Sequence, residues 1–335
     1  MLIEKTDSIE QYSEKYHDYS NEKELAPFMS QPKAMPVGVF GKCGFLRLGF
    51  EVDSSGKSIL RDWERRVPLI VQKALYFDEN LPEIPCVYIL SSGGPNVDGD
   101  RYAQVITLKK DSMAYISTGA STKIGSMKYN FSALNQLIEL EENAYLEYIP
   151  EPVIPSANSR FFSKTIMRVD KSATIFYSEI YMCGRKFYDE GEIFKYDLLM
   201  LETVGKRLND EVLYKDKSVI KPKEENPAIL GIMGDNDVFA NIIIMTPKDK
   251  ISEIHDLLKP LIGIKSPGII KEGFVVEDQE DYVGFAVNYL SNDAGLIIRV
   301  LGKNTTSVKR SVRFVCSQLR TVIKGVEMPE EFPWR

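Results

Sequence analysis

Short runs of apolar and β-branched residues recur along most of this 335-residue sequence, and they constrain its fold more than any other feature. From Phe45 to Val52, apolar and polar residues alternate with the two-residue period of a strand. Comparable runs lie near residues 59–65, 67–76, 86–90, 102–108, 113–118, 131–140, 144–149, 161–169, 173–182, 193–201, 238–245, 282–287 and 296–301. Gly, Asn, Asp or Pro separates most of these runs, as expected for turns. The pattern predicts a mostly β fold, although the period alone does not distinguish stacked sheets from a sandwich or a barrel.

Two segments have the spacing of helices instead. The first covers residues 252–259 and should end or kink at Pro260. The second runs from about 306 to 324, with Val or Leu every three or four residues, and Gly325 is placed to end it. The other face of this second helix is basic, and we interpret its charges as solvated rather than as a docking surface. These basic residues are Lys309, Arg310, Arg313, Arg320 and Lys324.

The two ends of the chain differ from its body. Residues 1–37 are charged and tyrosine-rich and are then interrupted by prolines, so we interpret them as an N-terminal extension that is either partly disordered or docked as a helix. The body spans 38–328 and includes the C-terminal helix 306–324, and residues 329–335 form a tail. Within the body, the charged and proline-containing stretch 215–226 predicts a mobile loop.

Composition limits the class of protein. The chain is 44% hydrophobic, which is enough apolar material for one or two sizeable cores. Its net charge is −6, which gives no reason to expect binding to nucleic acid. It has no run of about 18 apolar residues, so we expect no membrane span. The acidic N-terminus lacks the features of a signal peptide. Four widely spaced cysteines without a CxxC motif indicate reduced thiols, and we expect a cytoplasmic protein.

A glycine-rich loop runs from Ser91 to Asp100 between two strand-like runs. Gly93, Gly94 and Gly99 allow backbone conformations that other residues avoid. A phosphate cradle would need backbone amides converging at the start of a helix, yet this loop exits into a strand and no Gly-Lys-Ser/Thr follows. The sequence therefore favours a tight connection between two strands over a nucleotide site.

The sequence offers little for catalysis or tight metal binding. It has only two histidines, His17 and His255, with no HExxH motif, no clustered cysteines and no GxSxG motif. We therefore expect neither an enzyme nor a tightly bound cofactor. The remaining candidates are scattered carboxylates, each of which taken singly is most simply a surface acid, but which together suit weak, exchangeable binding of a cation. They are Asp98, Asp100, Glu147, Glu151, Glu179, Asp189, Glu190 and Glu192.

Several motifs resemble one known family. GGPNVDGD at 93–100 followed by STGASTKIG at 117–125 resembles the GGxxGGD…TTPxATK signature of the urease accessory protein UreD, called UreH in some bacteria. Further segments resemble other parts of the family in the same order, which makes the resemblance specific over roughly residues 40–325. These segments are 44–48, 67–76, 146–154, 179–185 and 298–302. The sequence departs from the family at Asp98, where glycine is usual, and at Pro150-Glu151-Pro152, where the family has Pro-Gln-Glu.

The resemblance implies a fold and a function. It implies two stacked sheets in a β-helix-like arrangement with about two α-helices, one of them C-terminal. It also implies a scaffold that binds apo-urease together with UreF and, through UreF, the GTPase UreG, in a dimer of such heteromeric complexes. The scaffold would assist delivery of Ni²⁺, held only transiently, to the urease active site. Family knowledge adds an internal water-filled tunnel, lined in part by acidic residues, as the metal route.

The resemblance also points to particular residues. As tunnel-lining carboxylates it suggests Asp100, Glu151 and Glu179. As structural or partner-binding positions within the matched motifs it suggests Gly93, Gly94, Gly99, Thr118, Lys123, Gly184 and Arg185.

Two alternatives stay open. The chain could be an enzyme or binding module that uses loop 93–100 on a phosphorylated or sugar ligand. Glu179 lies in a strand-like run of mostly apolar and aromatic residues, where a carboxylate needs either a partner or water. It could face an internal channel, or it could form an ion pair with Arg185 or Lys186.

Overall fold

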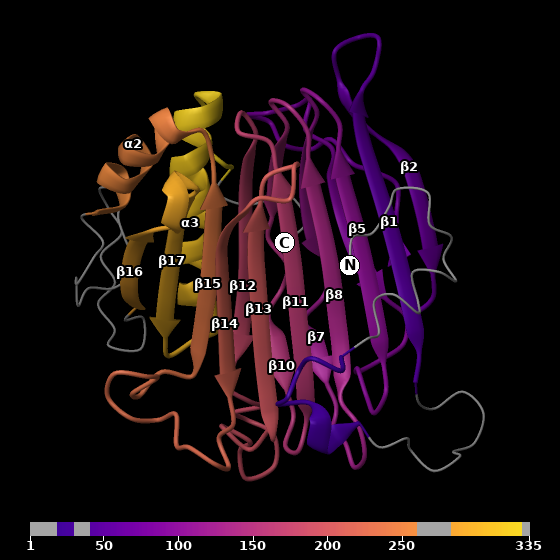
Figure 1. The fold of residues 1–335 in the computed structure, drawn as a ribbon, viewed down its shortest axis with the longest axis vertical. Helices are drawn as coiled ribbons and strands as arrows, with labels where there is room; N and C mark the ends of the chain where they lie inside the picture. The colour runs from indigo at the N-terminus through magenta and orange to yellow at the C-terminus, as the bar shows by residue number, and fades with distance from the viewer. Residues whose placement is uncertain (1–18, 30–40, 260–282, 330–335) are drawn as a thin grey trace.

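The computed structural model of the chain describes residues 19–29, 41–259 and 283–329. Two β-sheets lie face to face, and two helices cover part of the outside of one of them (Figure 1). Sheet A has the order β14 (Val212–Ile220), β13 (Leu198–Lys206), β11 (Arg160–Val169), β8 (Ser132–Leu140), β5 (Arg101–Leu108), β1 (Cys43–Val52) and β2 (Ser58–Arg66). Sheet B has the order β16 (Val283–Tyr289), β17 (Gly295–Gly302), β15 (Val238–Met245), β12 (Thr174–Met182), β9 (Tyr145–Tyr148), β6 (Met113–Thr118), β4 (Cys86–Ser91) and β3 (Leu69–Val71). Two short strands, β7 (Thr122–Ile124) and β10 (Val153–Pro155), pair with each other, and β10 also pairs with β12.

The middle of the chain coils between the two sheets. Successive strands alternate, with β4, β6, β9 and β12 in sheet B and β5, β8, β11 and β13 in sheet A, and neighbours within each of these sets are parallel. Antiparallel strands then finish both sheets at their edges. This confirms the predicted mostly β fold of two stacked sheets in a β-helix-like arrangement.

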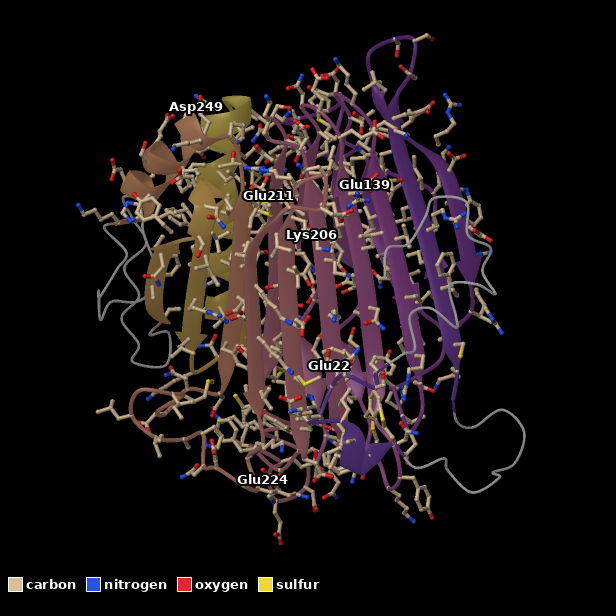
Figure 2. All side chains as sticks on the ribbon, in the orientation of Figure 1. Glu22, Glu139, Lys206, Glu211, Glu224 and Asp249 are labelled. Carbon is tan, nitrogen blue, oxygen red and sulfur yellow. The ribbon has the colours of Figure 1, made fainter. Side chains whose placement is uncertain are left out.

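Apolar side chains fill most of the space between the sheets. Leu46, Leu48 and Phe50 of β1 are fully buried there, as the two-residue period predicts. The opposite, outward face of sheet A is polar in places, where Glu139 of β8 and Lys206 of β13 are labelled in Figure 2.

The C-terminal helix α3 (Thr305–Lys324) packs on the outer face of sheet B. Val308, Val312, Val315 and Leu319 are fully buried against strands of that sheet. The helix begins at an Asn304 cap and ends at Gly325, whose φ of +73° is the left-handed conformation expected of a terminating glycine. This helix confirms the prediction for 306–324. Beside it lies α2 (Lys248–Leu258), which begins four residues before the predicted start at 252, and Pro260 falls outside the described residues.

Two sequence-based predictions were wrong. The stretch 215–226 is not all loop, because residues up to Ile220 belong to β14, which pairs along its length with β13. The lysines of this stretch suggested a loop. They instead lie on a strand at the edge of the sheet, where their side chains reach solvent, and Leu213 and Tyr214 of the same strand are buried. Arg320 is not solvated: its side chain is completely buried in ion pairs between α3 and sheet B.

Further strands differ from prediction only in extent. The run predicted for 67–76 forms a strand only over β3, and the later run near 193–201 is shifted to β13. The two short strands β7 and β10 were not predicted, because three residues are too few to show a period.

Residues 19–29 of the predicted N-terminal extension pack on sheet A. Tyr19 and Leu25 are buried beside Phe131 and Phe162, and the Asn135 amide donates a hydrogen bond of 2.8 Å to the Tyr19 hydroxyl. Their only regular element is a 3-10 turn, η1 (Ala26–Phe28), so this part is docked without an α-helix. The rest of the extension, 1–18 and 30–37, lies outside the described residues. In the described part of the chain, no helix is long and apolar enough to span a membrane.

Candidate functional site

The family-like motifs meet at one end of the two sheets. Loops 91–100, 118–131, 149–159 and 183–197 all connect strands at this end, which is the lower end in Figure 1 and which we call the motif end. Backbone hydrogen bonds join the loops to one another. They run from Asn96 N to Lys123 O (2.8 Å), from Ser156 N to Ile124 O (2.9 Å) and from Asn158 N to Lys195 O (2.9 Å). The coil between sheets therefore gathers segments that are far apart in sequence.

Two aspartates hold the glycine-rich loop together. The Asp100 side chain is fully buried and accepts hydrogen bonds from the backbone N–H groups of Lys42 and Val97, both at 2.9 Å, and pairs with Lys42 Nζ at 3.0 Å. Asp98 accepts from the N–H groups of Lys128 and Asn130, both at 2.8 Å. These carboxylates occupy backbone amides that a phosphate would need, and they would repel an anion. The loop is a connection between β4 and β5, as the sequence favoured, and its geometry does not support the phosphate alternative.

Gly99 is held in a conformation that few residues adopt. Its φ is +77°, and a Cβ atom there would lie 3.4 Å from Gly41 Cα. We expect Gly99→Val to lower the free energy of unfolding by about 1–2 kcal/mol, because a β-branched residue is strongly disfavoured at positive φ. Thermal unfolding checks this, with Gly99→Asn as the matched control, since asparagine tolerates this region better. Equal losses for both variants would place the cost in crowding against Gly41 rather than in φ.

The other motif positions are also built into the loops. Gly94 has a φ of +66°, and a Cβ on Gly93 would lie 2.8 Å from Pro68 Cβ. The Thr118 hydroxyl accepts a hydrogen bond of 2.9 Å from Glu151 N, which joins two motif loops. Lys123 contributes its carbonyl to the loop network while its side chain is exposed.

The loop after β12 is fixed by Gly184 and Arg185. A Cβ on Gly184 would lie 2.0 Å from the Glu192 carbonyl oxygen, so only glycine fits without a shift. Arg185 forms a two-pronged ion pair with Glu192, at 2.5 and 2.7 Å, and its guanidinium lies 3.6 Å from the centre of the Tyr188 ring. Hydrogen bonding within this pair raises the pKa of Arg185 and lowers the pKa of Glu192.

A cavity of about 80 Å³, lined mostly by apolar side chains with several polar groups among them, lies between the sheets and reaches residues of the motif end. Its walls include Gln104, Gln136, Tyr148, Tyr177 and Glu179 among apolar neighbours. Gln136 links them: its amide donates to the Tyr148 hydroxyl at 2.7 Å and to Gln104 Oε1 at 3.1 Å. We did not single out these glutamines and tyrosines from the sequence.

A signal for this polar cluster was present in the strand register. Gln104, Gln136 and Thr165 stand opposite one another on β5, β8 and β11, and Thr203 of β13 continues the row. These residues interrupt inward faces that are otherwise mostly apolar. Recognising the row requires the pairing of four strands, which the sequence alone does not supply.

Glu179 of β12 is one of two acidic residues in the wall of this cavity. It is only 6% exposed, and its Oε1 accepts hydrogen bonds from the Tyr177 hydroxyl at 2.6 Å and the Ser163 hydroxyl at 3.4 Å. Its Oε2 has no hydrogen bond of ordinary geometry among the described residues, although the Tyr181 hydroxyl also favours the ionised carboxylate. Burial raises the pKa of Glu179 from 4.5 to about 6, although the hydroxyls of Tyr177, Tyr181 and Ser163 act in the opposite direction.

The alternative ion pair for Glu179 is not formed. Arg185 pairs with Glu192, and Lys186 pairs with Asp237 at 2.6 Å. Glu179 is instead part of the wall of the cavity.

The other two predicted carboxylates are placed differently. Glu151 also lines the cavity, but both its oxygens are held by Lys309 Nζ of α3, at 2.8 and 2.9 Å. Asp100 is not part of the cavity wall and is used within its loop. In the described residues, no group of three or more His, Cys, Asp or Glu side chains is placed to hold a metal ion. The cavity has only a few oxygen atoms that could bind a cation, and such a set favours brief contact over tight binding.

Comparison with known proteins places this chain among the urease accessory proteins, which are maturation factors rather than catalytic enzymes. The family described as UreD urease accessory protein matches residues 42–335, and the chain belongs to that family. A relative named urease accessory protein UreD 2, from Brucella suis biovar 1, is 38% identical over 312 residues, covering 93% of this chain and 98% of the relative. UreD of Photorhabdus laumondii is 37% identical over 315 residues, covering 94% of this chain and 93% of the relative. These findings confirm the family that the motifs indicated.

Proposed function

We propose that this protein is a cytoplasmic scaffold for urease maturation. It binds apo-urease together with UreF and, through UreF, the GTPase UreG, in a dimer of such heteromeric complexes, and it assists delivery of Ni²⁺ to the urease active site. Nickel is cargo in this proposal and not a resident cofactor. The observation that carries it is the buried Glu179 carboxylate, one oxygen of which has no hydrogen-bond partner among the described residues, in the wall of a cavity beside the motif end.

A carboxylate oxygen without a hydrogen-bond partner is costly in a protein interior unless water or a cation reaches it. The cavity of about 80 Å³ is large enough for water, which needs roughly 10–15 Å³ by the same kind of measure. The amide of Gln136 and the phenol groups of Tyr148 and Tyr177, which hydrogen-bond to one another, belong to the polar part of the cavity wall. Such a site supports short residence of a hydrated divalent cation, because one carboxylate with neutral oxygens binds weakly.

Glu151 extends the acidic surface of the cavity. Lys309 forms an ion pair with Glu151, so Glu151 would contribute only after this ion pair opens. Glu179 is the one of the two carboxylates that has an oxygen without a hydrogen-bond partner among the described residues.

We expect Glu179→Gln to assemble with UreF, UreG and urease but to yield urease with less nickel and lower activity when nickel is limiting. The substitution keeps the acceptor for Tyr177 and removes the charge. Nickel content per urease and activity measure the effect, and Glu142→Gln, an exposed carboxylate paired with Lys110, is the matched control. Full activation at limiting nickel would remove Glu179 from the route. Failure to assemble would mean that its role is structural.

A further inference from the structure

We propose that loops 183–197 and 221–237 together form a docking surface for a protein partner whose own surface is apolar with a basic rim. The inference rests on the proposed function, in which the chain works within an assembly. The surface, which we call the apolar end surface, consists of Phe187, Tyr188, Ile229, Leu230 and Ile232.

These five side chains are unusually exposed for their type. Leu230 is 99% exposed and Phe187 94%, and Tyr188, Ile229 and Ile232 are each about half exposed. Single exposed apolar residues are ordinary, but a group of large ones carried by two neighbouring loops is typical of protein–protein contacts. Exposed phenylalanine and leucine side chains are in contact with water, and a partner that covers them lowers the free energy of the system.

The two loops lie side by side. Lys186 Nζ of the first loop pairs with Asp237 of the second at 2.6 Å, and Cys183 N donates to the Asp237 carbonyl at 2.8 Å. Lys223 of the second loop pairs with Asp197 of the first at 2.5 Å. These contacts join the two loops at both flanks, and we infer that their exposed apolar side chains serve one partner together.

Both loops are held in shape from within. In the first, Gly184 and the Arg185–Glu192 ion pair fix the backbone that presents Phe187. In the second, Met233 N donates to the Pro227 carbonyl and Gly234 N to the Ile229 carbonyl, both at 3.0 Å, and the Met233 side chain is buried in the core. A surface already fixed before binding loses little conformational freedom when a partner arrives.

The charge around the surface selects the partner. The two loops contain five basic and eight acidic residues, a net charge of −3. Lys186 and Lys223 are already held in ion pairs. Four exposed acids in these loops have no ion-pair partner among the described residues: Asp189, Glu190, Glu225 and Asp235. A second copy of this chain would bring the same negative rim against itself, so the complementary occupant is a different protein with lysines or arginines around an apolar patch.

The position of the surface ties it to the cavity. Loop 183–197 is one of the motif loops and follows directly on β12, the strand that carries Glu179. Figure 2 labels Glu224 at the lower end of the molecule, where loop 221–237 lies. A partner seated here would cover the end of the protein that the cavity reaches.

We test this with the double variant Phe187→Ser/Leu230→Ser in the full chain, co-expressed with UreF, UreG and apo-urease, and with each of the three separately. Binding to the protein that contacts the surface directly, which we take to be UreF, should weaken about tenfold or more, while thermal unfolding of the variant stays near that of the wild type. Trp63→Ser, which removes a side chain 52% exposed on β2, is the matched control and should leave binding unchanged.

The charge component is tested separately with Asp189→Asn/Glu190→Gln. This variant should bind more slowly at low salt and should depend less on ionic strength than the wild type. Wild-type binding of all three proteins by the Phe187/Leu230 variant overturns the proposal, as does a loss of self-association in place of a loss of partner binding. If the wild-type chain itself binds none of the three, the proposed function fails and not the surface alone.

Discussion

Arg320→Met is expected to lower the free energy of unfolding by about 3–5 kcal/mol, because it leaves two buried carboxylates without their cation. The Arg320 side chain is completely buried. Its Nε and Nη2 contact the two oxygens of Glu147 at 2.7 and 2.6 Å, and its Nη1 contacts Asp78 at 2.6 Å. The Tyr145 hydroxyl donates a further bond of 2.5 Å to Glu147.

This network joins α3 to sheet B and to the segment before β4. Burial alone would lower the pKa of Arg320, but the Glu147 carboxylate raises it above its ordinary value, so the charge is retained. Methionine fills a similar volume, and the loss therefore measures the unpaired charges rather than a cavity.

Thermal or denaturant unfolding of the purified assembly measures the effect. Arg310→Met, at an exposed position of the same helix, is the matched control and should cost much less. The triple variant Arg320→Met/Glu147→Gln/Asp78→Asn should recover part of the loss, because it removes the buried charges as well as their partner. A loss no larger than that of the Arg310 variant would show that the network adds nothing to stability.

Arg320 also shows a feature of the structure that local sequence patterns do not predict. The apolar stripe of the C-terminal helix was recognised from Val308, Val312 and Val315, and it is buried as predicted. Arg320 follows Val312 and Cys316 at intervals of four and so lies on the same buried face. Its charge led to the prediction that it lies on the solvated face of the helix, because an arginine is expected to be buried only where a carboxylate pairs with it. That carboxylate is 173 positions away in sequence, and no local pattern reveals it.

The sequence predicted the fold better than it predicted the candidate site. Turn residues and two-residue alternation located most strands, because these signals are local. β14 was missed because lysines at a sheet edge resemble a polar loop. The motifs correctly marked the loops that gather at one end. They did not reveal that Asp100 binds its own loop or that Glu151 faces Lys309, since both depend on contacts between distant segments.

Glu179→Gln is expected to change how stability depends on pH. Burial raises the pKa of Glu179 from 4.5 to about 6, so the folded protein holds a proton there more firmly than the unfolded chain does. Between these two pH values the folded state binds more protons, and the contribution of Glu179 to stability falls as the pH rises. Above about pH 6 the full cost of burying the charge remains, about 2 kcal/mol.

Glutamine has no such titration. The stability of the variant relative to the wild type should therefore improve by about 2 kcal/mol between pH 4 and pH 7. Any constant cost of placing an amide beside Tyr177 cancels in this comparison. Unfolding measured at several pH values gives the difference directly, with the exposed Glu142→Gln variant measured in parallel as the control. A difference between the Glu179 variant and the wild type that stays constant across this range would show that the carboxylate ionises as readily inside the cavity as in the unfolded chain. The cavity would then hold enough water to solvate the charge fully.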